Sequence, residues 1–276
     1  MAGGEHVVLV VHGVANRTPA DFQDEIDALN PALAPRAIVP VFWGDLGPAD
    51  ATASFPVIEG SIAIDRGDDD DADSSLRARL RRITDAVDAL SPESFATGLR
   101  RTIARTVRDV EAYERNGESI RARLDEAYRT ARGDAERVDV VAHSLGGLVA
   151  VEWLFGAPAG NGATAPGERR IHTLVTFGTQ VGLFCELRGL QGPPGTIALP
   201  PAPISLTLAL RRWCNVWHAL DPLAFAAAPA FTVAGRDGPV GIEDYRLPVH
   251  GVPESAAFHT AYWRDLHFGA WLDRTL

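Results

Sequence analysis

The sequence predicts an α/β fold: a mostly parallel, doubly wound sheet with helices on both faces. Continuous runs of β-branched and other apolar residues occur at residues 6–12, 37–43, 138–142, 171–177 and 213–218. Such runs are typical of strands that are buried on both faces of a parallel sheet. Segments with apolar residues at helical spacing lie between most of these runs, and this alternation indicates a doubly wound sheet.

The first helix is expected directly after the first strand. Thr18 is a suitable N-cap, and Pro19 suits the first helical position. Apolar residues then repeat at helical spacing from Phe22 to Leu29, and Asn30-Pro31 is expected to end the helix. The length of 276 residues fits a single domain over residues 1–276 better than two independent ones.

A helical insertion or cap is expected at about residues 60–133, between the early strands and the strand that starts at Val138. The apolar spacing predicts one amphipathic helix over residues 76–90 and a second that starts at Ser91 and stops at Asn116-Gly117. A third runs from Ile120 to Gly133. Further along, we expect a loop at 191–203, short β segments within 231–249 and a last helix from about Thr260.

The amino-acid composition argues against several classes of protein. Acidic residues exceed basic ones by 36 to 26, a formal charge of −10, which argues against a nucleic-acid partner. The apolar run Val7–Val11 is too short for an export signal or a membrane span, so stable membrane insertion is not expected. Cys185 and Cys214 are expected to be reduced core residues of a cytoplasmic protein, although a bridge between them stays open. No metal site and no cofactor are expected.

The segment from Val140 to Ala150 carries the strongest functional signal. A buried strand runs straight into His143 and Ser144 and then into a helix of small and apolar residues, as in a nucleophile elbow. Residues two before and two after such a serine must be small, and Ala142 and Gly146 meet this need. The turn places Ser144 at a helix N-terminus, where the backbone N–H of Leu145 would stabilise a developing oxyanion.

A second signal lies at the end of the first strand, at His12-Gly13-Val14. In this kind of fold the other oxyanion donor comes from the loop after an early strand. We therefore assign that role to the backbone N–H of Val14. Gly13 is expected to allow a close approach, and His12 to orient the loop.

Taken together, these segments resemble the α/β-hydrolases of the lipase and esterase type. The resemblance covers Val7 to about Trp263 apart from the helical insertion. It implies a Ser-acid-His chain order and a hydrolase activity, but it does not fix a substrate. The motifs that carry it are Val11-His12-Gly13, Ala142 to Gly147, Thr176-Phe177-Gly178, and Asn215 followed by Asp221-Pro222.

The expected acid is Asp221, which follows the strand at 213–218 and precedes the strand-breaking Pro222. Functional groups gather beyond the carboxyl ends of the strands in open α/β sheets. The Asp-Pro segment of the family matches here as well. Asp237, Glu243 and Asp244 are the alternatives.

The expected base is His259, which lies just before the final helix and ahead of an aromatic pair, as in the family. His250, in a turn-like segment, stays open as an alternative. His267 falls inside the last helix, where its neighbours suggest a packing role. Other candidates for substrate binding are His12, Gly13, His143, Trp43 and Gln180, although Trp43 suits the edge of the core equally well.

These residues predict hydrolysis of a carboxylic ester through an acyl-enzyme, with Ser144 as nucleophile, His259 as base and Asp221 as its partner. The substrate would be a small-molecule or lipid ester. One alternative is a lipase or phospholipase whose helical insertion is a lid. Another is a non-catalytic binding or signalling module on the same fold. Acyltransferase, thioesterase and peptidase activities share the machinery, and the sequence does not indicate an oligomeric state.

Overall fold

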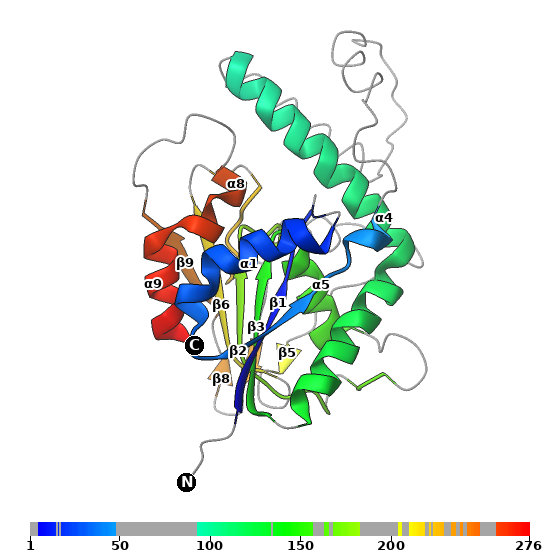
Figure 1. Ribbon diagram of the computed structural model, residues 1–276, viewed down its shortest axis with the longest axis vertical. Helices are drawn as coiled ribbons and strands as arrows, with labels where there is room; N and C mark the ends of the chain where they lie inside the picture. The colour runs from blue at the N-terminus through cyan, green and yellow to red at the C-terminus, as the bar shows by residue number, and fades with distance from the viewer. Residues whose placement is uncertain are drawn as a thin grey trace.

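The fold is built on a six-stranded sheet in which every neighbouring pair is parallel, in the order β2-β1-β3-β4-β6-β9 (Figure 1). This computed structural model describes residues 5–14, 16, 18–47, 93–133, 135–156, 163–165, 168–182, 204–205, 210–218, 221, 223–228, 233–235, 238–239, 242–248 and 258–276. The six strands are β1 (Glu5–Val11), β2 (Ala37–Val41), β3 (Ala135–His143), β4 (Ile171–Phe177), β6 (Leu210–His218) and β9 (Glu243–Leu247). The prediction of a mostly parallel sheet is confirmed.

A smaller sheet accompanies the main one. In it β5 (Ile204–Ser205) runs parallel to β7 (Val233–Gly235), and β7 pairs antiparallel with β8 (Gly238–Pro239). The short β segments expected within residues 231–249 are thus β7, β8 and β9, and only β9 joins the main sheet.

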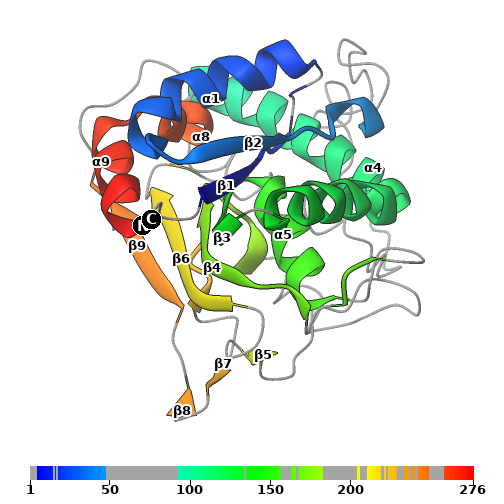
Figure 2. The same ribbon diagram turned by 60° about the horizontal axis from the view of Figure 1, so that its bottom comes forward.

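Helices cover both faces of the main sheet, as Figure 2 shows. On one face lie α1 (Pro19–Leu33) and the C-terminal segments α8 (Phe258–Ala261), η4 (Tyr262–Arg264) and α9 (Leu266–Thr275). The other face carries α4 (Glu93–Arg132) and α5 (Leu145–Phe155), and η1 (Gly44–Leu46) follows β2. Side chains alternate along β1, so that Val8 and Val10 join the core under α1 while Val7, Leu9 and Val11 join the core under α4 and α5.

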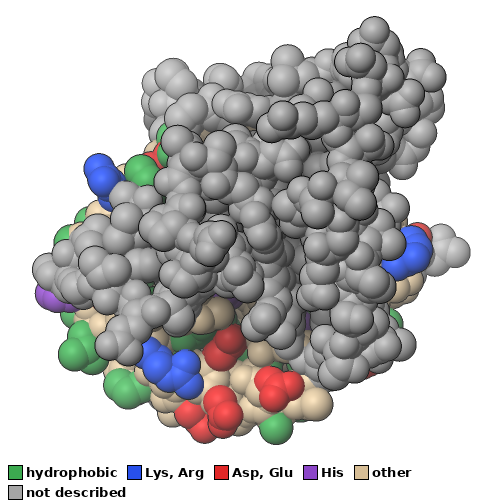
Figure 3. All heavy atoms as spheres, turned by 90° about the horizontal axis from the view of Figure 1, so that it is seen from above, with side chains coloured by type: hydrophobic (Ala, Val, Ile, Leu, Met, Phe, Trp, Pro, Cys, Tyr) green, Lys and Arg blue, Asp and Glu red, His purple; other side chains and the backbone are tan. Residues whose placement is uncertain are grey.

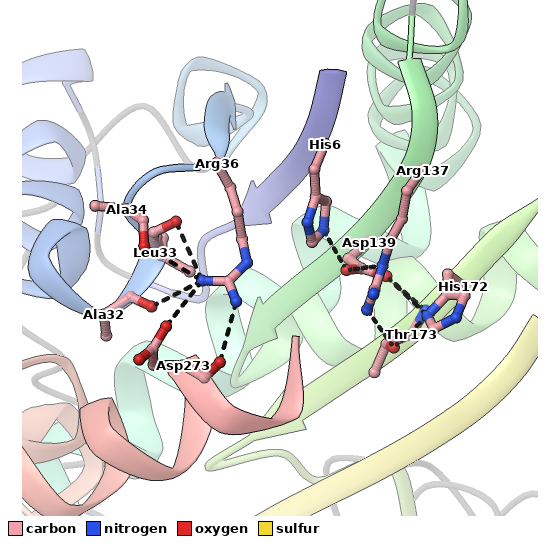
Figure 4. A network of polar contacts seen from close by, with 10 residues as sticks. All are labelled: His6, Ala32, Leu33, Ala34, Arg36, Arg137, Asp139, His172, Thr173 and Asp273. Carbon is pink, nitrogen blue, oxygen red and sulfur yellow. Dashed lines mark hydrogen bonds and ion pairs between the residues drawn. The ribbon is translucent and has the colours of Figure 1, made fainter. Parts of the chain in front are cut away.

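Polar contacts at the end of the sheet away from the serine turn join three central strands (Figure 4). The buried carboxylate of Asp139 on β3 lies 2.6 Å from His6 Nε2 on β1 and 3.0 Å from Arg137 Nε, and accepts from the Thr173 N–H of β4 at 2.7 Å. Nearby, Arg36 donates to Asp273 of α9 and to carbonyls in the last turn of α1. These contacts neutralise a buried charge and satisfy carbonyls that a helix end leaves unpaired.

The expected end of α1 at Asn30-Pro31 is wrong, because the helix continues to Leu33. Its start agrees with the sequence: the Thr18 side chain accepts from the Asp21 N–H in a capping box. Pro31 lacks the N–H that would bond to the residue four before it, at a cost of about 3 kcal/mol. The extra turn buries Leu33 completely, which returns a similar amount.

The expected helix break at Asn116-Gly117 is also wrong, because α4 is one helix of 40 residues. Its side chains are described from Ala112 onward. Asn116 donates to the Leu46 carbonyl at 2.9 Å instead of ending the helix. A helical glycine costs about 1 kcal/mol relative to alanine, and the burial of Tyr113, Ile120 and Leu124 on either side of Gly117 outweighs this cost.

The expected single last helix is divided into α8, η4 and α9. Asp265 causes the division, since its side chain accepts from the N–H groups of His267 and Phe268 and caps a new helix. His267 is exposed on α9, so the expected packing role is wrong. Several predictions concern residues outside the described ones: the helix over 76–90 with the rest of the insertion at 60–92, the loop at 191–203, Cys185, Pro222, Asp237 and His250. Cys214, by contrast, is a buried free thiol in β6.

The continuity of α4 through Gly117 can be tested by replacing this glycine with alanine. A Cβ at Gly117 would meet Arg121 Nη1, the far end of a long side chain, at 3.1 Å and the Tyr113 ring at 3.4 Å, and no backbone atom outside the helix is nearer. Gly117→Ala should therefore leave the free energy of unfolding unchanged or raise it by up to about 1 kcal/mol, measured by urea denaturation. A loss of more than about 1 kcal/mol would indicate a helix end at this residue.

Gly146→Ala is the matched control. There a Cβ would lie 2.4 Å from the His12 carbonyl oxygen and 2.8 Å from that of Val11, both backbone atoms. The same exchange should thus lower the free energy of unfolding by about 1–3 kcal/mol or more.

Candidate active site

Ser144 occupies a strained turn between β3 and α5. Its φ of 53° and ψ of −125° make it the sole non-glycine with positive φ in the described part of the chain. Such a conformation costs on the order of 1–3 kcal/mol and persists where its surroundings fix it. Here the Ser144 N–H donates to the Phe177 carbonyl at 3.0 Å, and its own carbonyl accepts from Thr179 Oγ1 at 3.0 Å.

Two glycines bring the β1 loop against this turn. A Cβ at Gly13 would lie 2.5 Å from Ser144 Cβ and 3.1 Å from Ser144 Oγ, so only a glycine fits there without a shift. Gly146 stands in the same relation to the His12 carbonyl. The loop that carries Val14 therefore passes directly beside Ser144, as the sequence predicts for Gly13.

Ser144, His259 and Asp221 form one hydrogen-bonded chain, although they lie far apart in the sequence. His259 Nε2 is 2.7 Å from Ser144 Oγ, and His259 Nδ1 is 2.9 Å from Asp221 Oδ2. Because an ionised carboxylate only accepts, Nδ1 carries the ring proton and Nε2 accepts from the serine hydroxyl. The structure thus brings together the three residues that the sequence singled out.

The Asp221 carboxylate is held by two further donors. The Leu223 N–H donates to Oδ1 at 3.0 Å, and Tyr262 Oη donates to Oδ2 at 3.0 Å. Burial and the adjacent Asp221 raise the pKa of Tyr262 well above its ordinary value, so the phenol keeps its proton. Tyr262 accepts in turn from the His218 N–H, which fixes its ring at the end of β6.

His143 positions the backbone of the base. Burial and the neighbouring His259 lower the pKa of His143 well below its ordinary value, so its ring is neutral. His143 Nε2 lies 2.7 Å from the His259 carbonyl oxygen, and since that oxygen only accepts, Nε2 carries the proton. The structure therefore places His143 behind His259, where it holds α8.

The two amides expected to stabilise an oxyanion flank the serine. The Leu145 N–H is the first in α5, where a helix offers no internal acceptor. Val14 follows Gly13, the residue in contact with Ser144, and is half-buried. Both N–H groups therefore lie in segments that touch the serine.

His12 and Trp43 are part of the core instead of facing a substrate. The rings stack at 4.7 Å between centroids, and both side chains are fully buried. His12 Nε2 accepts from the Trp43 N–H, which leaves Nδ1 to donate to the Gly13 carbonyl. His12 thus orients the loop, as expected, whereas the core-edge alternative describes Trp43.

Gln180 lies directly beside the serine. Its Nε2 is 3.4 Å from Ser144 Oγ, and the side chain is almost completely buried. Thr179, the preceding residue, bonds to the Ser144 carbonyl. Of the second-rank candidates, the structure brings Gln180 and Gly13 against the Ser144 side chain.

The alternative acids have other partners. Glu243 pairs with Arg212 at 2.6 Å on the exposed edge. Asp244 accepts from the N–H groups of Ala227 and Ala228 and from Asn215 Nδ2. Asp244 and Asn215 thereby hold the loop that carries Asp221, because Asn215 also donates to the Phe225 carbonyl.

Sequence reasoning missed three residues of this arrangement: Tyr262, Asp244 in its supporting role, and Glu25. Glu25 on α1 accepts from Asn16 Nδ2 at 2.8 Å, which ties α1 to the loop after β1. Burial raises the pKa of Glu25 to about 7, against the opposing effects of Asn16, Arg264 and His259. Its position three residues after Phe22 in an amphipathic helix was the one available signal.

The three residues of the hydrogen-bonded chain are buried: Ser144 is 0% exposed, Asp221 3% and His259 4%. Seen from above (Figure 3), the described residues in view include both acidic and arginine side chains near the rim of the molecule. Within the described residues, no cluster of three or more His, Cys, Asp or Glu could hold a metal, and no helix is both long and apolar enough to span a membrane.

The parallel sheet, the strained serine turn after a central strand, and the acid and histidine that follow in that order define an α/β-hydrolase type of fold. No protein-family model and no curated protein matches the sequence. Among solved structures, the chain is similar to dienelactone hydrolase from Anabaena variabilis, with 15% identity and a TM-score of 0.38. That match covers 95% of this chain and 84% of that chain, and the likeness concerns the fold alone.

The buried carboxyl of Glu25 should make the free energy of unfolding depend on pH. Its folded-state pKa of about 7 lies above its ordinary value of 4.5, so the folded protein holds this proton more tightly than the unfolded chain does. The free energy of unfolding should therefore fall as pH rises from about 4.5 to 7. Glu25→Gln removes this loss and should stabilise the protein by about 2 kcal/mol at pH 8 but little near pH 5, measured by urea unfolding.

Asp24→Asn serves as the control for net charge, because it removes a like charge from the exposed side of the same helix. An equal gain for Glu25→Gln at both pH values would show that burial of the Glu25 carboxylate is not the cause.

Proposed function

We propose that this protein is a serine hydrolase that cleaves carboxylic esters through an acyl-enzyme. The single observation that carries the proposal is the hydrogen-bonded chain from Ser144 Oγ through His259 to Asp221, with distances of 2.7 and 2.9 Å. A nucleophile within hydrogen-bond reach of a base, which a third group orients, is the arrangement that activates a serine.

In the first half of the reaction, Ser144 Oγ attacks the ester carbonyl carbon while His259 Nε2 takes the hydroxyl proton. The carbonyl oxygen becomes an oxyanion, and the N–H groups of Leu145 and Val14 stabilise it. His259 then gives its proton to the leaving alcohol, and the acyl group stays on Ser144. Asp221 stabilises the imidazolium and keeps the proton on Nδ1 throughout.

In the second half, His259 takes a proton from water, whose oxygen attacks the acyl carbon. Collapse of the second oxyanion breaks the bond to Ser144 Oγ, and the proton on His259 returns to the serine. Buried and neutral partners support this exchange, because Tyr262 and the Leu223 N–H hold the Asp221 carboxylate while His143 holds the backbone of His259.

The substrate class we propose is a small-molecule or lipid ester. The formal net charge of −10 does not favour a nucleic-acid partner. A lipase with a helical lid and a non-catalytic binding module remain predictions from the sequence, with no contact among the described residues that favours either.

Ester hydrolysis should depend on both Ser144 and His259. With 4-nitrophenyl esters of short acids, Ser144→Ala and His259→Ala should each lower kcat by a factor of about 10³ or more, because either change removes the activated nucleophile. Circular dichroism and urea unfolding check that each variant is folded.

His267→Ala is the matched control, since His267 is an exposed histidine of the adjacent α9 outside the hydrogen-bonded chain. It should retain kcat within about twofold. Near-normal hydrolysis by folded His259→Ala would contradict the assignment of the base, and near-normal hydrolysis by Ser144→Ala would contradict the proposed function.

A further inference from the structure

The proton arrangement at Ser144 fixes how the Gln180 amide is turned. Ser144 donates its hydroxyl proton to His259 Nε2, so its oxygen has only lone pairs left for Gln180. A carbonyl oxygen in that place would face those lone pairs and be repelled. The amide nitrogen of Gln180 must therefore face Ser144 Oγ, at 3.4 Å, and the carbonyl oxygen must point elsewhere.

In this orientation, Gln180 Oε1 is buried and has no hydrogen-bond partner. The whole residue is 3% exposed, so the unpaired oxygen is not simply open to solvent. A buried acceptor without a donor is costly and rare in folded proteins. Such a group at a candidate catalytic centre indicates a site for a ligand donor.

Covalent geometry keeps this oxygen close to the reaction centre. The oxygen and nitrogen of an amide lie about 2.2 Å apart, so Oε1 is within about 6 Å of Ser144 Oγ. The backbone around Gln180 is also fixed: Thr179 bonds to the Ser144 carbonyl, and the Phe225 N–H donates to the Thr179 carbonyl at 3.1 Å. The acceptor is thus held in place before a ligand binds.

The position of Gln180 in the sheet indicates which part of a substrate it meets. β3 lies between β1, whose loop carries Val14, and β4, whose loop carries Gln180. When the substrate carbonyl oxygen points to the amides of Val14 and Leu145, the other substituents of the carbonyl carbon point toward the β4 side. Gln180 then faces the acyl chain or the alcohol, near the bond that is cleaved.

We propose that Gln180 is a specificity-determining residue that selects esters with a hydrogen-bond donor, a hydroxyl or an amide N–H, on an atom close to the scissile carbonyl. The inference rests on the proposed function and names its substrate class. The donor pairs with Oε1 and removes the cost of the unpaired acceptor. An analogue without the donor leaves that cost in place and is rejected by about ten- to hundredfold in kcat/KM.

The test uses pairs of esters that differ only in a hydroxyl or a methoxy group, placed at C2 or C3 of the acyl chain or at C2 of the alcohol. A methoxy group resembles the hydroxyl in polarity but cannot donate. The wild-type protein should prefer the hydroxyl member of at least one pair by about ten- to hundredfold in kcat/KM. Gln180→Met should reduce that preference to about twofold or less, because Met matches the length of Gln but lacks the amide oxygen.

Gln180→Glu is the rescue variant, since it keeps an acceptor oxygen at the same reach, and it should retain the preference for the hydroxyl member. The readout is the ratio of kcat/KM between the hydroxyl and the methoxy member of a pair. Gln180→Met also removes the contact of Nε2 with Ser144, but that loss affects both members equally and leaves the ratio unchanged. Loss of the ratio in Gln180→Met and its retention in Gln180→Glu would support the role of the acceptor.

Three outcomes would overturn the proposal. If Ser144-dependent hydrolysis shows no hydroxyl preference in any pair, or if the preference survives in Gln180→Met, the specificity role is wrong while the proposed function stands. In the second of these cases, equal slowing of acyl release for all esters would show that the amide positions the attacking water instead. If hydrolysis does not depend on Ser144, the proposed function fails as well.

Discussion

The backbone of Ser144 is the constraint on which the rest of the site depends. Positive φ at a non-glycine residue is unfavourable, and here two neighbouring loops maintain it. Phe177 at the end of β4 and Thr179 in the loop after it bond to the two peptide groups of the serine, while a Cβ at Gly13 in the loop after β1 would collide with its side chain. The strain is therefore balanced by packing in a buried part of the sheet, and it turns the hydroxyl toward His259.

Partners that do not touch the serine fix the rest of the arrangement. Tyr262 and the Leu223 N–H hold Asp221, His143 holds the backbone of His259, and Asn215 with Asp244 holds the loop between them. Because these contacts hold the acid, the base and the loop near them, the imidazole has little freedom to leave its place. Gln180 is the exception, since one of its amide atoms has no partner. This contrast is why we assign it to the substrate instead of the scaffold.

The sequence patterns correctly predicted the structural features that depend on residues close together in the chain. Buried strands, the small residues around Ser144 and the Thr18 N-cap depend on neighbours within a few residues, and each lies where it was expected. The patterns failed where tertiary packing outweighs a local preference, as at Pro31 in α1 and Gly117 in α4. Tyr262 was missed for a similar reason: an aromatic residue in an amphipathic segment is ordinarily part of the core, and only its bond to Asp221 shows a second role. The same applies to His143 and Trp43, which the sequence offered as substrate-binding residues. Tertiary packing instead places Trp43 in the core and His143 against the backbone of His259.

The most direct test of the account is to map where a fluorophosphonate reacts, by mass spectrometry of the labelled, folded protein. Convergence of the three side chains predicts one adduct, on Ser144, and a rate of labelling that falls by orders of magnitude in His259→Ala while the fold is retained. An adduct at another residue, or labelling of Ser144 that does not depend on His259, would contradict it.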